Sequence, residues 1–202
     1  EDINPLAVQY VLVWEPEAGW LSQFPNLRVI FSSGAGVDHI VDRDSTYPKH
    51  VPIVRMFTPE SAQHMADHVL MTSLMAIRNF AQAAEQQRTK TWFTYETPVT
   101  TNQVNVGVMG LGNLGLATAT KLHQSGFKVL GWSKSEKKSD FIHCYFGEAG
   151  FTDFLANSQL VVNLLPQTSE THHILNQNTL SQLPEGAAVI NVGRGTHVDI
   201  DG

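Results

Sequence analysis

The chain has 202 residues, of which 42% are hydrophobic and 16% are charged, and its formal net charge is −6. This length suits one large domain or two small ones, and the negative charge argues against nucleic acid or an anionic membrane as the main partner. No apolar run approaches the roughly 20 residues that span a bilayer, and the acidic start EDINPLA does not resemble a signal peptide. A single cysteine, Cys144, excludes an internal disulfide and fits a cytoplasmic protein.

Short apolar runs rich in Val, Ile and Leu alternate with helical segments along the chain. Runs of this kind are typical of parallel strands that are covered on both faces. In chain order they occupy residues 10–14, 27–33, 51–56, 104–109, 127–132, 160–165 and 187–192. The intervening segment LGLATATKLHQSG fits a crossover helix that Gly126 ends. The pattern predicts a doubly wound α/β fold.

A long helix is predicted over residues 59–87. Thr58 can cap it, Pro59 suits its first turn, and Glu60 favours its positive end. Its middle is apolar around more than one narrow stripe, which indicates burial on two sides. The apolar residues are Met65, Val69, Leu70, Leu74, Met75, Ile77 and Phe80.

The stretch VNVGVMGLGNLG combines an apolar strand, the pattern G-x-G-x-x-G and the start of a helix. Gly110 allows a tight turn, Gly112 lets the backbone approach a pyrophosphate, and Gly115 permits close packing of helix on strand. The phosphates would lie at the helix N-terminus, beside Asn113 and Leu114, where unpaired amides and the helix dipole favour anions. We therefore predict a dinucleotide site; a tight turn without a ligand is the alternative.

The next apolar strand ends in VLGWSKSEKK, without a carboxylate. A site for NAD needs Asp or Glu there, about 20 residues past the glycine loop, to bind the ribose 2′-hydroxyl. Ser133 and Lys134 stand at this place instead. Nothing then repels a 2′-phosphate, and both side chains can donate hydrogen bonds to it. The pattern favours NADPH, with NADH as the second choice and a solvated lysine turn as the alternative.

Arg194 stands between two glycines at the end of the last apolar run, in INVGRGTHVD. An arginine there can bind a planar anion through its guanidinium fork. Together with the glycine loop, SSGAGVDHI and NLLPQTSETHHIL, this motif resembles the D-isomer-specific 2-hydroxyacid dehydrogenase family. The resemblance covers essentially the whole chain and is strongest to the glyoxylate/hydroxypyruvate reductases of that family.

The resemblance implies several site residues. The backbone amides of Ala35 and Gly36 would hold the substrate carboxylate, and Trp14 would line the pocket. Arg194 would bind carboxylate and keto oxygen together and polarise the carbonyl for hydride attack; a structural salt bridge is the alternative. Additional cofactor contacts would come from Met65, Leu164, Leu165, Pro166, Thr171 and Gly193. Trp14 and Met65 are equally compatible with plain core packing.

The family also uses a histidine acid and a glutamate that orients it, both from strands beyond the GRG loop. No residue here matches them, so we expect a fragment, truncated at both ends and inactive alone. His197 and His39 are weak candidates for the acid. His64 and His68 are four residues apart but lack the glutamate of H-E-x-x-H, and no metal site is expected.

Residues 1–58 are therefore expected to form a partial, flavodoxin-like substrate-binding lobe, and residues 59–202 a partial Rossmann-like NAD(P)-binding domain. The helix over 59–87 is expected to form a homodimer contact, unless it is buried within one subunit. The expected function is reduction of small 2-keto acids, such as glyoxylate and hydroxypyruvate, by hydride transfer from NADPH. A non-catalytic NAD(P)-binding regulatory module is the alternative.

Overall fold

The computed structural model describes residues 3–93 and 99–200, and the chain divides into two compact units, Glu1–Thr58 and Pro59–Gly202. We call them the N-terminal and the C-terminal unit. The first contains a sheet of three strands and the second a sheet of five, and every strand pair in both is parallel. The α/β fold with parallel sheets that the apolar runs predicted is confirmed.

In the N-terminal unit the three strands follow one another across the sheet. They are β1 (Tyr10–Val13), β2 (Val29–Ser32) and β3 (Ile53–Arg55). The short helix η1 (Pro5–Ala7) precedes β1, while η2 (Leu21–Gln23) lies between β1 and β2 and α1 (Asp38–Val41) between β2 and β3. One face of the sheet is buried, because Val11, Val13 and Ile30 pack into a core with Leu21 and Ile40. All three strands end at the same edge, where the β2–α1 loop begins.

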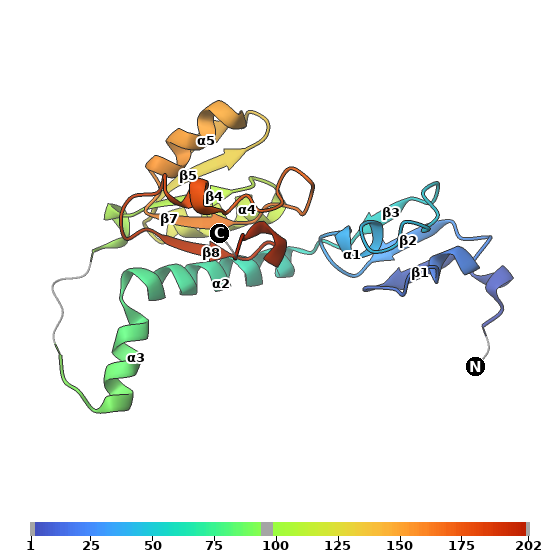
Figure 1. Ribbon diagram of the computed structural model, residues 1–202, viewed down its shortest axis with the longest axis horizontal. Helices are drawn as coiled ribbons and strands as arrows, with labels where there is room; N and C mark the ends of the chain where they lie inside the picture. The colour runs from blue at the N-terminus through green and yellow to red at the C-terminus, as the bar shows by residue number, and fades with distance from the viewer. Residues whose placement is uncertain (1–2, 94–98, 201–202) are drawn as a thin grey trace. The chain divides into compact units, whose positions relative to one another are not determined.

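The sheet of the C-terminal unit has its first strand in the middle. Its strands are β4 (Asn105–Met109), β5 (Lys128–Ser133), β6 (Ile142–Phe146), β7 (Leu160–Asn163) and β8 (Ala188–Asn191), in the order β6-β5-β4-β7-β8 (Figure 1). The chain therefore runs outward from β4 to one side, returns to β7 and runs outward to the other side. Ligands of open α/β sheets bind at such a reversal, beyond the carboxyl ends of the strands.

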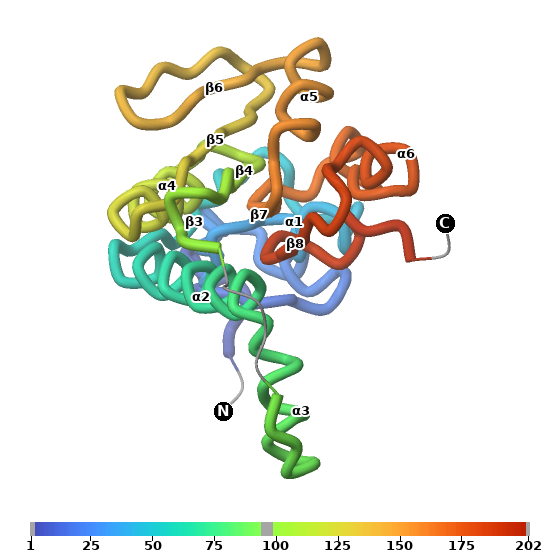
Figure 2. The backbone as a smooth tube through the Cα atoms, turned by 90° about the vertical axis from the view of Figure 1, so that its left-hand side faces the viewer, coloured from blue at the N-terminus to red at the C-terminus, as the bar shows by residue number. Residues whose placement is uncertain are grey.

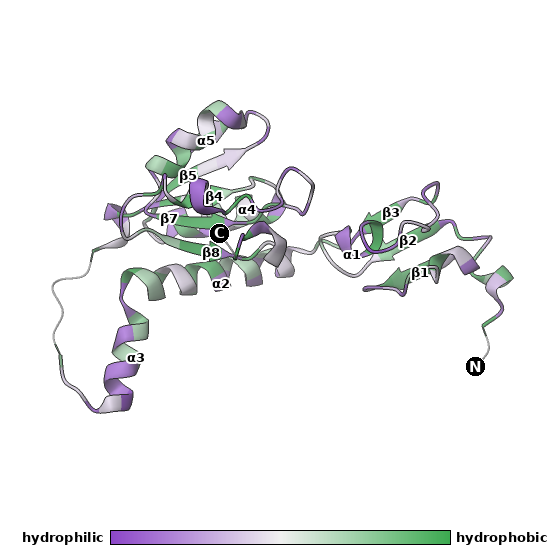
Figure 3. Cartoon of the chain, viewed as in Figure 1, coloured by the Kyte–Doolittle hydropathy of each residue, from purple (hydrophilic) through white to green (hydrophobic). Residues whose placement is uncertain are grey.

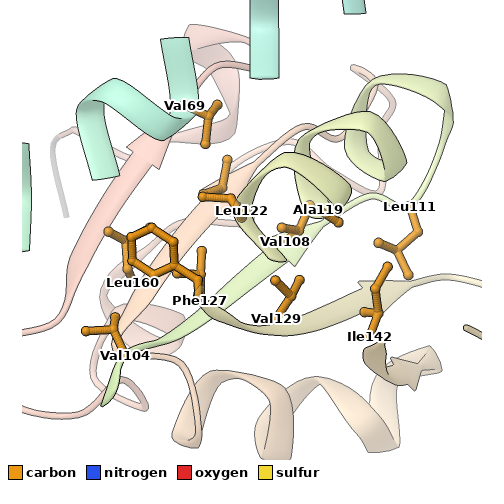
Figure 4. Packing of buried hydrophobic residues seen from close by; sticks show 12 residues of the cluster. Val69, Val104, Val108, Leu111, Ala119, Leu122, Phe127, Val129, Ile142 and Leu160 are labelled. Carbon is orange, nitrogen blue, oxygen red and sulfur yellow. The ribbon is translucent and has the colours of Figure 1, made fainter. Parts of the chain in front are cut away.

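Helices cover both faces of this sheet. Helices α2 (Pro59–Ile77) and α4 (Asn113–Gln124) pack on one face and α5 (Gly147–Ala156) on the other (Figure 1). Figure 4 shows Val69 of α2 and Leu122 of α4 directed into one apolar cluster with Val108 of β4. Among residues 3–93 and 99–200, no helix has the length and apolar content needed to cross a membrane. The other helices of this unit in the described residues are α3 (Phe80–Thr89), α6 (Gln177–Leu180), η3 (Thr101–Gln103) and η4 (Gly195–His197).

The prediction of one helix over residues 59–87 was wrong, because the chain forms α2 and α3 with a break between them. Asn79 stands at that break with φ = 50°, a left-handed conformation that Asn tolerates better than most residues. Figure 3 contrasts the apolar α2 with the largely polar α3, which leads away from the sheet in Figure 1.

Burial of the helix on two sides was also predicted and is not found in the described chain. The buried residues of α2 form one stripe, namely Ala62, Ala66, Val69 and Ser73. On other faces of α2 and on α3 the apolar side chains of Met71, Leu74, Met75 and Phe80 are exposed by 37% to 52%. Part of the apolar surface of α2 is thus not covered by the rest of the C-terminal unit.

Strand β6 was not predicted. It lies outermost in the sheet beside β5, at the top of Figure 2, and only Ile142 among its residues is buried. An edge strand packs on fewer neighbours than a central one, so its sequence, IHCYF, carries no continuous apolar run. The seven predicted strands are all present, shortened or shifted by a few residues at their ends.

Candidate functional site

The glycine loop lies between β4 and α4, at the reversal of the sheet. Gly110 has φ = +93°, a conformation that side chains rarely adopt, and a Cβ there would lie 3.1 Å from the carbonyl oxygen of Leu164. A Cβ on Gly115 would overlap the carbonyl oxygen of Gly110. Helix α4 therefore packs against the turn through backbone alone, and larger residues do not fit at either position.

Gly112 has the opposite surroundings. It is the N-cap of α4, makes no side-chain capping bond, and a Cβ there would meet nothing within 4 Å. The N-terminal amides of a helix lack partners within the helix, so without a capping side chain those of Asn113 and Leu114 are available to an anion. Open space beside uncapped amides fits a bound pyrophosphate.

The parallel register brings the other cofactor candidates of the C-terminal unit to the same edge. Met109 pairs with Trp132 on one side and with Asn163 on the other, and Asn163 pairs with Asn191. The residues at and just beyond these strand ends are therefore neighbours along the edge. They are Gly110, Ser133, Lys134, Leu164, Leu165 and Gly193.

Lys134, predicted to bind a 2′-phosphate, is paired within the chain. Its Nζ lies 2.7 Å and 2.8 Å from the two carboxylate oxygens of Glu170. Ser133 is 7% exposed and donates through Oγ to the carbonyl of Ser135, at 2.8 Å. Both partners of the Lys134–Glu170 pair are well exposed, which makes the pair weak and exchangeable.

Thr171 closes the loop that follows β7. Its Oγ1 donates to the carbonyl of Pro166 at 2.7 Å and accepts from the amide of Thr168 at 2.9 Å. Leu164 donates its amide to the carbonyl of Met109 at 2.9 Å, which ties the loop to the end of β4. The loop is thus fixed beside the glycine loop.

Arg194 follows β8 and is half-buried, as the N-cap of η4. Its Nη1 donates to the carbonyl of Gly193 at 3.3 Å. Its backbone amide and carbonyl are held by His197 and Asn191. The backbone that carries the Arg194 side chain is therefore fixed by hydrogen bonds, at the same edge of the sheet as the glycine loop.

In the N-terminal unit the loop after β2 carries the predicted carboxylate-binding residues. Ser32 Oγ accepts from the amide of Gly34 at 3.2 Å and donates to the carbonyl of Gly36 at 3.0 Å. Within the described chain the amides of Ala35 and Gly36 donate no hydrogen bond, as expected for a carboxylate nest. Trp14 is 58% exposed and packs over Gly34, so it lies against the start of the loop that contains Ala35 and Gly36.

Histidine and methionine candidates have other surroundings. Met65 is half-buried against the core of the C-terminal unit, and His64 and His68 are exposed on α2. His39 is buried against Trp14, with ring centroids 4.4 Å apart, and its Nε2 lies 3.1 Å from Ser32 Oγ. His39 therefore packs beneath the loop of the N-terminal unit.

Residues 70–202 match the D-isomer specific 2-hydroxyacid dehydrogenase family, in its NAD binding domain. The chain belongs to this family. A 2-hydroxyacid dehydrogenase of Xanthobacter autotrophicus, crystallised with NADPH and MES, is 41% identical and superposes with a TM-score of 0.91 over 98% of this chain and 62% of that one. The resemblance drawn from the motifs is confirmed.

Two further relatives carry a more specific name. Glyoxylate/hydroxypyruvate reductase A of Yersinia enterocolitica is 36% identical over 193 residues, which are 94% of this chain and 61% of that protein. The NADPH-dependent glyoxylate/hydroxypyruvate reductase of Sinorhizobium meliloti, crystallised with NADP and sulfate, is 34% identical with a TM-score of 0.88, over 96% of this chain and 61% of that one. The chain spans 61% to 63% of the length of the curated relatives it matches.

Two residues of this candidate site, Glu170 and Asn163, were not predicted. Glu170 meets Lys134 across 36 positions of sequence, and Asn163 meets His197 across 34. Both Glu170 and Asn163 belong to the motif NLLPQTSETHHIL, but the neighbouring sequence of neither residue indicates its partner. Only the pairing of strand ends brings these side chains together.

Proposed function

We propose that the protein reduces small 2-keto acids, such as glyoxylate and hydroxypyruvate, to the corresponding 2-hydroxy acids with NADPH. The observation that carries this proposal is the uncapped N-terminus of α4 beside Gly112, on the same sheet edge as Arg194. The first loop suits a pyrophosphate, and the guanidinium of Arg194 is a group that can bind a carboxylate and a keto oxygen together.

In this proposal NADPH supplies the hydride, and the chain binds and orients it. The amides at the start of α4 hold the pyrophosphate, and Ser133 and Lys134 hold the 2′-phosphate. The loops after β7 and β8, with Met65, border the nicotinamide half; they contribute Leu164, Leu165, Pro166, Thr171 and Gly193. Support comes from relatives whose structures contain NADPH or NADP.

Each unit contributes candidate substrate-binding groups. We assign its carboxylate to the amides of Ala35 and Gly36, with Trp14 as a wall of the pocket. Arg194 binds the substrate as well and stabilises the negative charge that develops on the keto oxygen as hydride arrives. The N-terminal unit then serves as part of the substrate-binding lobe and the C-terminal unit as part of the NAD(P)-binding domain.

The exposed apolar face of α2 supports a homodimer. Met71, Leu74 and Met75 are exposed by 50%, 37% and 39%, and covering such surface is favourable by about 25 cal/mol per Å². Sedimentation of the protein at micromolar concentration should show a dimer, and Leu74→Glu should shift it toward the monomer. A clean monomer in the parent would exclude this part of the proposal.

Steady-state kinetics of the polypeptide at its relatives' length test the enzymatic role. We expect reduction of glyoxylate with a higher kcat/KM for NADPH than for NADH, and a shift toward NADH in Ser133→Asp, whose carboxylate repels a 2′-phosphate. The parent is this polypeptide without substitutions. Equal efficiency with both cofactors in the parent would refute the NADPH preference, and binding without turnover in the longer polypeptide would favour a regulatory module.

A further inference from the structure

A polar cluster lies buried beneath the arginine loop. Asn163, the last residue of β7, and His197, in η4, are both fully buried. Burying such groups costs free energy unless they are hydrogen-bonded. The hydrogen bonds of Asn163 and His197 therefore indicate the role of these residues. These bonds connect both side chains to the backbone of Arg194.

The amide of Asn163 has one orientation that satisfies its surroundings. Its Oδ1 accepts from the amide of Leu165 at 3.1 Å, so the other terminal atom is the NH2 group. That Nδ2 donates one hydrogen to Oδ1 of Asn191 at 3.0 Å and directs the other at Nδ1 of His197, 2.8 Å away. Both N–H groups of Asn163 and one acceptor position of its Oδ1 are thus used.

A second donor reaches the same nitrogen of His197. The backbone amide of Arg194 lies 3.2 Å from Nδ1, and a backbone amide can only donate. Two N–H groups thus converge on Nδ1, which must be an acceptor without a proton. A neutral imidazole then carries its proton on Nε2, and an imidazolium, which donates from both nitrogens, would lose both bonds.

The same cluster holds the other side of the loop. Asn191 Nδ2 donates to the carbonyl of Arg194 at 2.9 Å, and the amide of Gly193 donates to Asn191 Oδ1 at 3.2 Å. A Cβ on Gly193 would lie 2.7 Å from His197 Nδ1 and 3.1 Å from Asn163 Nδ2. The loop is packed on these side chains without room for an added methyl group.

We infer that Asn163 and His197 are positioning residues, which fix the backbone of Arg194 through a neutral His197 that accepts at Nδ1. The inference rests on the proposed role of Arg194 in keto-acid reduction. It also removes His197 as the general acid of that reaction. Its Nδ1 already accepts two hydrogen bonds, and its Nε2 is buried.

Three variants distinguish a role of His197 in positioning Arg194 from a general role in stabilising the fold. His197→Leu removes the acceptor, His197→Asn offers a carbonyl oxygen at the same distance from the backbone as Nδ1, and His143→Leu changes an exposed histidine of β6 as a control. Because misplacing a catalytic group by about 1 Å can cost on the order of 100-fold, we expect His197→Leu to lower kcat/KM for glyoxylate by about 10- to 100-fold. His197→Asn should recover most of this loss.

The dissociation constant of NADPH serves as the internal reference. It should stay near the parent value in both His197 variants, since the α4 amides that hold the pyrophosphate are untouched and Gly193 only borders the nicotinamide half. Unchanged reduction kinetics in His197→Leu would overturn the inference, and so would a loss in His197→Asn as large as that in His197→Leu.

A spectrum of the parent tests the protonation directly. A long-range ¹H–¹⁵N correlation distinguishes a protonated from an unprotonated ring nitrogen, and His197→Asn identifies the signals of His197. We expect Nδ1 unprotonated and Nε2 protonated at neutral pH. A proton on Nδ1 would overturn the inference whatever the activity, whereas a parent that reduces no 2-keto acid would overturn the proposed function and leave this spectrum to decide the role of His197.

Discussion

The glycine loop after β4 and the arginine loop after β8 lie at the same sheet edge but are built differently. The first is shaped mainly by backbone, since its tightest contacts join Gly115 to the carbonyl of Gly110 and Gly110 to the carbonyl of Leu164, and its open anion site lies at Gly112. The second is held by side chains of Asn163, Asn191 and His197, up to 34 positions apart. A backbone-built site follows from the spacing of glycines, whereas a side-chain-built site requires contacts across the sheet.

Substitutions of two glycines within the glycine loop, Gly115 and Gly112, should differ most in their effect on stability. Gly115→Ala places a Cβ on the backbone of Gly110, where nothing can yield, so we expect destabilisation beyond the ~1–3 kcal/mol of ordinary overpacking. Gly112→Ala meets open space and should keep the stability of the parent while weakening NADPH binding. Urea unfolding and NADPH titration measure the two effects. Equal stability of the two variants would contradict the geometry.

The arginine loop offers a matched pair of its own. Gly193→Ala would press on His197 and Asn163, whereas a Cβ on Gly195 meets nothing within 4 Å. We expect Gly193→Ala to cost about 1–3 kcal/mol of unfolding free energy and to lower the rate of glyoxylate reduction. Gly195→Ala is the control and should resemble the parent in urea unfolding. Tolerance of Gly193→Ala would mean that the polar cluster is looser than its distances indicate.

One side-chain contact, the Lys134–Glu170 ion pair, also lies beside the predicted cofactor site. Removing it tests whether the cofactor site depends on side-chain contacts as the arginine loop does. Glu170 holds Lys134 and would repel a 2′-phosphate at the same place. Glu170→Gln should therefore tighten NADPH by about two- to fivefold, the range of an exposed ion pair, with little change for NADH. Glu148→Gln, an exposed carboxylate of α5, is the control. Weaker NADPH binding in Glu170→Gln would show that Glu170 orients Lys134 rather than competes for it.

The smallest effect concerns the packing of α2 on the helix of the glycine loop. Lys121 of α4 donates to Asp67 of α2 at 2.8 Å, and this bond, followed by one from Gln63, lowers the pKa of Asp67. A lowered pKa in the folded state gives stability that is present at neutral pH and is lost as pH falls below about 4, through the folded pKa. Asp67→Asn should thus be slightly less stable at pH 7 and match the parent at the acid end. A constant difference across pH would exclude this ion pair as its cause.

Local patterns in the sequence predicted the backbone-built parts of the fold. The three glycines of the loop required no knowledge of partners, and Gly126, with φ = +91°, follows α4 as expected. The break at Asn79 escaped prediction because its left-handed conformation interrupts a pattern that remains apolar through Phe80. An apolar period indicates a helical face but does not show where the backbone departs from the helix.

The side-chain contacts of the candidate site were beyond prediction for a different reason. His197 was considered only as an acid, because its distance from Asn163 follows from the β7–β8 register and not from the motif. Lys134 was read as an available cation, since Glu170 lies 36 positions away. In both cases the residue type was informative, and the partner depended on tertiary packing.

NADPH titration of the parent, Gly112→Val and Arg194→Gln tests the central claim most directly, namely that the glycine loop binds the dinucleotide while the arginine loop acts on the keto acid. Fluorescence of the bound cofactor gives the dissociation constants, and circular dichroism confirms that each variant is folded. We expect Gly112→Val to weaken NADPH by more than tenfold, or over about 1.4 kcal/mol, and Arg194→Gln to bind it like the parent. Parent-like affinity in Gly112→Val, or an equal loss in Arg194→Gln, would contradict this division.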